Sequence, residues 1–251
     1  MTVDLTSLSM AEIWKLYAEY YGRLRLLHPY RQLLLTAISE MNSHINLKPT
    51  STIFDAAGGD GGLLWALQSD PALPKPRVLL IDQSPDMIAR AQCEPYDGQV
   101  DCRVADIDQP HTTWFIPEPV DAVHCGHAVY ASNDPCALIR RFAAVTKPNG
   151  VLVFTNPLPE PNMMAVLKEH LAVVAAAGLD VGAELAMLQT ELAPLVAIND
   201  EILRHSGQLH MSDEATTLAW LDPRYWQLQN HYRTYAGNDL MVVATRTEKS
   251  V

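Results

Sequence analysis

The chain has 251 residues, of which 48% are hydrophobic and 19% charged, a composition typical of a globular protein and not of a disordered one. Its formal net charge is −11 with only 18 Lys and Arg, which argues against a polyanionic partner because phosphate binding depends on those cations. We therefore expect a small-molecule substrate and no nucleic-acid partner. The length suits one α/β domain with an added helical cap.

Neither a membrane span nor a secretory leader is expected, because no run of about 18 apolar residues occurs and the first residues lack a basic region followed by an apolar one. We therefore expect a cytoplasmic protein. The four cysteines form no CxxC pair, and no His or Cys pattern has zinc spacing, so we expect reduced thiols and no metal site. The oligomeric state is left open, with a homodimer as one candidate.

The first 50 residues predict a helical cover. Apolar residues recur at spacings of three and four over residues 8–40, the period of an amphipathic helix. Ser9 is placed to cap the first helix, with Glu12 as its capping-box partner. The segment around Tyr17 and Tyr21 is rich in tyrosine, whose ring can pack and still offer a hydroxyl.

The glycine-rich stretch 53–64 organises the rest of the chain. Two apolar residues lead into Asp55, four glycines follow within residues 58–62, and an apolar helical segment begins at Leu63. This order predicts a buried strand, a tight turn and a helix. Because glycine lets the backbone approach a bound group and a helix start offers free N–H donors, we expect a ligand at this turn.

A second strand is predicted over residues 78–82, since a continuous apolar run ending in an acid is typical of a parallel strand buried on both faces. Asp82 lies 21 positions after Gly61, the spacing at which an acid reaches a ribose diol in a mononucleotide-binding unit. Ser84 and Pro85 then predict the start of the next helix.

Three more strands alternate with helices, which predicts a parallel sheet with right-handed crossovers. These strands are expected at residues 100–104, 120–127 and 150–155, and a helix starts at Asp134. Such sheets bind ligands at the carboxyl ends of their strands, so Asp55 and Gly59, Asp82, Asp106 and the segment 125–127 should converge on one rim.

Residues 157–211 change the pattern. Two apolar helical segments, 162–177 and 181–204, predict an inserted cap over the core. A helix from Ser212 and a final hairpin of strands at 226–233 and 240–246 follow. We therefore predict an α/β, doubly wound, Rossmann-like and mostly parallel seven-stranded sheet with a C-terminal antiparallel hairpin. Its cofactor-binding core should span 51–156 and 212–247.

This order of elements resembles the class I S-adenosylmethionine-dependent methyltransferases, over residues 50–247. In that family a D/ExGxGxG loop follows the first strand, and acids follow the second and third. The segment 55–61 fits this loop with Ala57 in the first glycine position, where alanine can take a right-handed or extended backbone. The tyrosine-rich lead-in and the C-terminal part look like the small-molecule C-, N- and O-methyltransferases, among them the quinone-biosynthesis enzymes.

The resemblance implies S-adenosylmethionine as cofactor and methyl transfer to a small-molecule O, N or C acceptor. It implies that Asp82 binds the ribose hydroxyls, that Asp106 accepts from the adenine amino group, and that Cys125 lies beside the sulfonium. The full set implied for the cofactor is Asp55, Ala57, Gly59, Gly61, Asp82, Gln83, Met87, Asp106, Ile107, Cys125 and Gly126.

The acceptor is expected beneath the cap and the first helix. The residues expected to contact it are Tyr17, Tyr21, Tyr130, Met163 and Met164. His127 is the first candidate for a general base and His124 the second, because imidazole titrates near working pH. Residues three apart on a strand point to opposite sides, so we expect the two to face different ways. The competing interpretation is a histidine that only satisfies a backbone carbonyl.

Three alternatives stay open at this point. An NAD(P)-dependent oxidoreductase would share the strand, glycine turn and distal acid, but Leu64 stands where its fingerprint needs a small residue. A protein that binds S-adenosylmethionine without methylating, as a rearrangement catalyst or binding subunit, fits the same motifs. A nucleic-acid methyltransferase is the weakest, since residues 156–159 only partly match the NPPY-type motif and follow the fifth strand.

Overall fold

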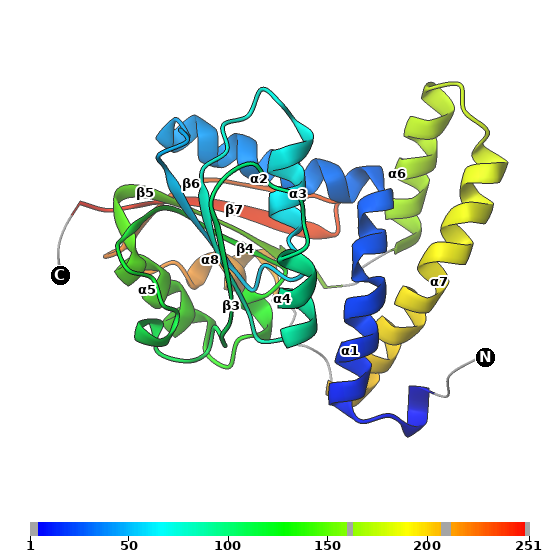
Figure 1. Cartoon of the computed structure of the whole chain (residues 1–251), viewed down its shortest axis with the longest axis horizontal. Coiled ribbons are helices and arrows are strands. Elements are labelled where there is room, and N and C mark those ends of the chain that lie inside the picture. The colour runs from blue at the N-terminus through cyan, green and yellow to red at the C-terminus, as the bar shows by residue number, and fades with distance from the viewer. Residues whose placement is uncertain (1–4, 160–162, 207–211, 249–251) are drawn as a thin grey trace.

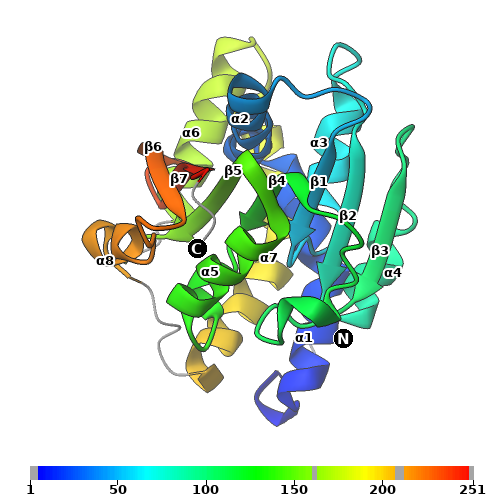
Figure 2. The ribbon, with the colours of Figure 1, turned by 90° about the vertical axis from the view of Figure 1, so that its left-hand side faces the viewer.

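The fold is the α/β, Rossmann-like arrangement that the sequence predicts: a seven-stranded sheet in the order β3-β2-β1-β4-β5-β7-β6 (Figure 2). The computed structural model describes residues 5–159, 163–206 and 212–248. Strands β1 to β5 are mutually parallel, and β7 runs antiparallel to both β5 and β6. The strands are β1 (Thr52–Ala56), β2 (Arg77–Asp82), β3 (Val100–Val104), β4 (Val120–Gly126), β5 (Thr146–Pro157), β6 (Trp226–Thr234) and β7 (Asp239–Arg246).

Helices cover both faces of the sheet (Figures 1 and 2). The α-helices are α1 (Met10–Tyr21), α2 (His28–Ile45), α3 (Gly62–Ser69), α4 (Pro85–Ala91), α5 (Pro135–Val145), α6 (Met163–Ala176), α7 (Val181–Ser206) and α8 (Glu214–Ala219). Short 3-10 helices are η1 (Leu5–Ser7), η2 (Gly22–Leu26), η3 (His111–Thr113) and η4 (Val129–Ala131).

The alternation of side chains along the strands divides the core into two layers. Ile53 in β1 packs in the layer that contains α2, α3 and α4, with Leu34 among its members. The next residue, Phe54, packs in the opposite layer with Phe142 of α5. Both layers are needed because a parallel sheet is apolar on both faces.

Several helix starts follow the caps that the sequence predicts. Ser9 and Glu12 form a full capping box at α1. The Ser84 side chain accepts from the N–H of Met87 at α4, and Asp134 caps α5 in the same way. Because these caps satisfy N–H groups that have no partner within the helix, they fix where each helix begins after its strand.

The helices α6 and α7 form a pair beside α1, at the edge of the molecule away from the sheet (Figure 1). Ile198 of α7 packs on Ile13 of α1. His170 of α6 accepts from the N–H of His28 at the start of α2 (2.9 Å) and lies 2.8 Å from Glu184 of α7. These contacts connect α6 and α7 to each other and to the helices α1 and α2.

One stretch of α7, Val181–Glu201, is long and apolar enough to cross a membrane, with a mean hydropathy of 1.3. Only 22% of that window is buried. One helix of this kind is weak evidence, because core helices of proteins outside membranes pass the same test. The expectation that the chain has no membrane span therefore stays a prediction.

Candidate functional site

A cavity of about 930 Å³ lies at the carboxyl ends of the strands, between the sheet edge and the helices α1 and α7. It brings together most of the residues that the sequence singled out. Those that line it are Tyr17, Tyr21, Ala57, Gly59, Asp82, Gln83, Met87, Asp106, Ile107, Gly126, His127, Tyr130 and Met163. The carboxyl ends of parallel strands thus meet at one rim, as expected for this topology.

The glycine-rich loop between β1 and α3 passes close under the cavity. The Gly58 N–H donates to the Ile81 carbonyl oxygen (2.9 Å), and a Cβ at Gly58 would lie 2.6 Å from Asp55 Oδ2, so this position has no room for a side chain. Ala57 has φ of +53°, in the left-handed region. The expectation of a right-handed or extended Ala57 is therefore wrong, and the loop holds it there at a cost of about 1 kcal/mol.

Asp82 at the end of β2 ties this loop to the neighbouring strand. Its Oδ2 accepts from the Gly59 N–H (3.0 Å) and its Oδ1 from the Ser84 N–H (2.8 Å). Burial raises the pKa of the carboxyl, and these two N–H donors oppose that effect. Each oxygen keeps a further lone pair, so the side chain can still accept a hydrogen bond from a ligand in the cavity.

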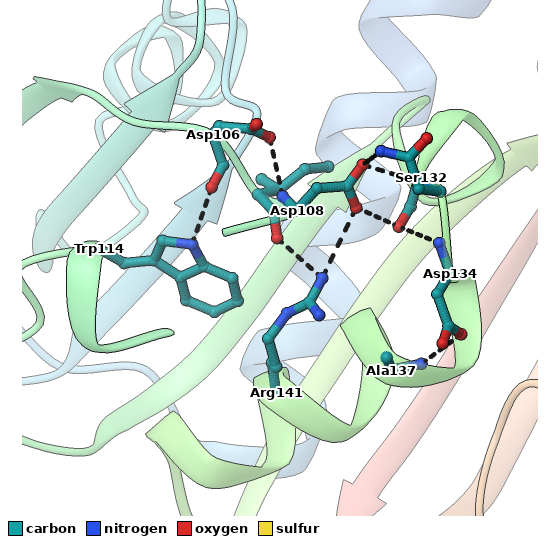
Figure 3. A network of polar contacts seen from close by, with 9 residues as sticks. Asp106, Asp108, Trp114, Ser132, Asp134, Ala137 and Arg141 are labelled. Atoms are coloured by element: carbon teal, nitrogen blue, oxygen red, sulfur yellow. Dashed lines mark hydrogen bonds and ion pairs between the residues drawn. The ribbon is translucent and has the colours of Figure 1, made fainter. Parts of the chain in front are cut away.

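The two acids after β3 have different roles (Figure 3). Asp108 is fully engaged: it accepts from the Ser132 hydroxyl, and its Oδ1 lies 3.6 Å from Arg141. Asp106 accepts from the Asp108 N–H with Oδ1 (2.8 Å), and its backbone oxygen accepts from Trp114 Nε1 (3.1 Å). Among the described residues, the other carboxylate oxygen of Asp106 has no hydrogen-bond partner. Asp106 is therefore the acid available to a ligand.

Five predicted site residues do not line this cavity: Asp55, Gly61, His124, Cys125 and Met164. Asp55 is buried behind the loop, where its Oδ1 lies 2.7 Å from His124 Nδ1. Gly61 caps α3 and lies against the backbone of α4. Cys125 is fully buried in the layer of α5, and burial raises the pKa of its thiol. Met164 is 58% exposed on the outer side of α6.

His127 follows β4 and faces an acid that the sequence analysis missed. Its Nε2 lies 3.0 Å from Asp239 Oδ1 at the start of β7, and Asp239 is only 2% exposed. Burial lowers the pKa of His127, but the negative charge of the nearby Asp239 outweighs burial, so the pKa is raised. Asp239 also lines the cavity, and its Oδ2 is buried without a hydrogen-bond partner among the described residues.

The prediction that His124 and His127 face opposite sides is wrong. Both line a smaller cavity of about 30 Å³ behind the glycine-rich loop. The alternation fails because β4 ends at Gly126 and His127 has φ of +52°, which turns the chain out of the strand. The His127 N–H donates to the carbonyl and hydroxyl oxygens of Thr155, which fixes this turn.

Aromatic side chains form a wall between α1 and His127. The ring centroids of Tyr17 and Tyr21 lie 5.3 Å apart, those of Tyr30 and Tyr235 5.8 Å, and those of Tyr235 and His127 6.0 Å. Burial is the main cause of the raised pKa of each of these tyrosines, so they stay neutral and act as hydrogen-bonding apolar surface. Tyr235, in the β6–β7 turn, lines the large cavity and was not predicted from the sequence.

The cap contributes its inner face to the same cavity. Met163 and Val166 of α6 and Leu195 and Asn199 of α7 line it opposite the sheet rim. The arrangement therefore provides two regions: an acidic rim with exposed backbone at β1, β2 and β3, and an aromatic region with a His–Asp pair at β4 and β7. A dinucleotide-sized or nucleoside ligand fits the first, and a second small molecule fits the second.

The comparisons with known proteins agree with this geometry. Residues 54–152 match a family model described as a methyltransferase domain. No curated protein matches the chain. The chain is similar in structure to the N-methyltransferase NodS from Bradyrhizobium japonicum WM9 in complex with S-adenosyl-L-homocysteine (16% identity, 90% of this chain and 91% of that chain, TM-score 0.57).

Two further solved structures share the fold. One is magnesium protoporphyrin IX methyltransferase (ChlM) from Synechocystis PCC 6803 with bound SAH (17% identity, 87% of this chain and 84% of that chain, TM-score 0.56). The other is a complex between the Haloferax volcanii Trm112 methyltransferase activator and the putative methyltransferase (15% identity, 96% and 99%, TM-score 0.60). Residues 54–152 therefore match a methyltransferase domain, and the chain as a whole shares the fold of these S-adenosylmethionine-dependent methyltransferases.

Proposed function

We propose that this enzyme uses S-adenosylmethionine to methylate a small-molecule acceptor. The observation that carries the proposal is the pair of acids at the ends of neighbouring strands, Asp82 and Asp106, which line one cavity beside a glycine-rich loop. The aromatic region of the same cavity supplies the place for an acceptor. The net charge of −11 favours a small molecule over a nucleic acid.

The residues present fit the cofactor. Asp82 has lone pairs left to accept from the two ribose hydroxyls, and Asp106 has one oxygen free for the adenine amino group. Ile107 and Met87 line the cavity beside them and offer apolar contacts to the base. The crowded position of Gly58 keeps the loop backbone close to β1, so that Gly59 faces the cavity without a side chain in the way.

When bound, S-adenosylmethionine supplies an electrophilic methyl group whose bond to sulfur breaks with the electron pair remaining on sulfur. The chain's own contribution is then alignment and the exclusion of water. Tyr17 and Tyr21 from α1 and Leu195 from α7 close the cavity opposite the strand ends. Holding two reactants in line in this way can supply roughly 7 to 11 kcal/mol of the barrier reduction.

The test has two stages. Binding of S-adenosylmethionine and S-adenosylhomocysteine is measured by titration calorimetry, with NADH as the comparison ligand. The protein is then incubated with methyl-labelled S-adenosylmethionine and pools of hydroxyl, amine and activated-carbon compounds, and S-adenosylhomocysteine is measured. Binding together with label transfer supports the proposal. Binding without any S-adenosylhomocysteine favours a protein that uses the cofactor for another purpose, and selective NADH binding contradicts the proposal.

A further inference from the structure

We propose that Asp239 positions His127 as the general base of the reaction, and that the acceptor is a phenol-type hydroxyl compound. This inference rests on the proposed function, because it assigns the proton transfer that accompanies methylation. Neither residue belongs to the region that fits the cofactor: His127 follows β4 and Asp239 starts β7, at the aromatic end of the cavity.

The geometry selects one tautomer of His127. Nε2 is buried and lies 3.0 Å from Asp239 Oδ1, so the negative charge of the carboxylate favours a proton on Nε2 over one on Nδ1. With that proton in place the neutral ring carries its lone pair on Nδ1. The His127 side chain is 22% exposed while Nε2 is buried, which means that the exposed atoms lie elsewhere on the ring. Asp239 thus holds the ring so that Nδ1 is the basic atom.

The backbone adds to this positioning. His127 is held at φ of +52° by its N–H donating to Thr155 from β5, so the ring is fixed from the main chain as well as from Nε2. Thr155 pairs with Met241 in β7, the strand that begins at Asp239. His127, bound through its N–H to β5, and Asp239, at the start of β7, are therefore both anchored to the same sheet.

The titratable groups around this pair come from four elements. Tyr235 from the β6–β7 turn and Tyr130 from η4 both have a pKa raised first by burial and then by the charge of Asp239. The buried pair Asp55 and His124 lies across the smaller cavity. Of these groups, Asp239 is the one whose charge raises the pKa of His127.

The chemistry fits a hydroxyl acceptor. The O–H bond breaks, its proton goes to Nδ1, and its electron pair stays on oxygen, which then takes the methyl group. The imidazolium that forms is stabilised by Asp239 and attracts the developing oxyanion. A flat phenol ring suits the tyrosine wall beside His127.

The first experiment reads the histidine directly, without an acceptor. Long-range ¹H–¹⁵N NMR spectra report the tautomer and pKa of His127 in the wild type and in Asp239→Asn. We expect the Nε2–H tautomer in the wild type and a lower pKa in the variant. Glu214→Gln is the matched control, since Glu214 Oε1 lies 2.8 Å from His231 Nε2 outside the cavity and its loss should leave His127 unchanged. An Nδ1–H tautomer, or an unchanged His127 pKa in Asp239→Asn, would overturn the positioning role.

The second experiment uses catechol and benzylamine as acceptor probes. We expect methylation of catechol, a rate that rises with pH as His127 loses its proton, and a rise at lower pH in Asp239→Asn with kcat reduced more than KM is changed. His127→Asn is the second variant, because asparagine tolerates the left-handed backbone at this position. It should keep S-adenosylhomocysteine affinity and lose the pH dependence. Methylation of benzylamine alone would overturn the acceptor class.

The two experiments separate this inference from the proposed function. If the protein binds no S-adenosylmethionine, the proposed function fails, while the NMR result still decides whether Asp239 sets the tautomer of His127. If it binds the cofactor but His127→Asn methylates catechol with the wild-type pH profile, only the role of His127 is overturned.

Discussion

Removal of the Asp82 carboxylate tests the proposed role of this residue in binding S-adenosylmethionine. The two oxygens accept from the Gly59 and Ser84 N–H groups, and each has a lone pair left for a ribose hydroxyl. A hydrogen bond to a charged group contributes about 1.5 to 3 kcal/mol, so loss of one such bond weakens binding by roughly 10- to 150-fold. Asp82→Ala removes both oxygens and also releases the loop at Gly59. We therefore expect its affinity to lie at or beyond the upper end of that range.

Titration calorimetry with S-adenosylhomocysteine at neutral pH measures the effect. Asp82→Asn keeps one acceptor oxygen, so its affinity should fall between that of Asp82→Ala and the wild type. Asp86→Asn is the control, because Asp86 lines the same cavity but is exposed, and its loss removes the same charge without touching the loop. Wild-type affinity in Asp82→Ala, or an equal loss in Asp86→Asn, would refute the assignment of Asp82 to the ribose.

Two further pairs of variants test the loop and the acids after β3. Ala57→Gly should raise the thermal unfolding midpoint, because it relieves about 1 kcal/mol of left-handed strain. Gly58→Ala should lower the midpoint, because the new Cβ would lie 2.6 Å from the Leu80 side chain. The opposite order of midpoints in calorimetry would contradict the loop geometry. Asp106→Asn should weaken S-adenosylhomocysteine binding with little change in the unfolding midpoint. Asp108→Asn should lower the midpoint, because it breaks the contacts to Ser132 and to Arg141 of α5. Equal losses of binding affinity in the two variants would contradict the assignment of Asp106 alone to the ligand.

The fold could be predicted because its signals are local. The cap at Ser84, the apolar run that ends at Asp82 and the glycine-rich turn after Asp55 each specify a strand end or helix start from neighbouring residues. Once the strands are parallel and in order, their acids have to meet at one rim. The convergence of these acids at one edge of the sheet could therefore be predicted from the sequence.

The pairing of His127 with Asp239 could not be predicted from local sequence signals. His127 and Asp239 meet because β7 inserts between β5 and β6, and no local pattern around Asp239 marks it as the partner of the histidine that follows β4. In the register of β1 and β4, Asp55 lies opposite His124, which explains why these two residues pair. Asp55 is therefore not the partner of His127. That register depends on the strand order, which the sequence gives only through resemblance.

The backbone of the loop was missed for a different reason. Alanine rarely takes positive φ, so the residue type at position 57 carries no signal that its backbone is left-handed. The side chain of Cys125 lies outside the cavity because strand alternation turns it toward α5, while the neighbouring Gly126 faces the cavity.

The most direct test of the central claim is a crystal structure of the protein with S-adenosylhomocysteine. The account predicts the ribose hydroxyls on Asp82, the adenine amino group on Asp106, and the sulfur directed toward the aromatic region that holds His127. An adenosine bound away from both acids, or a sulfur turned toward solvent outside the cavity, would contradict it.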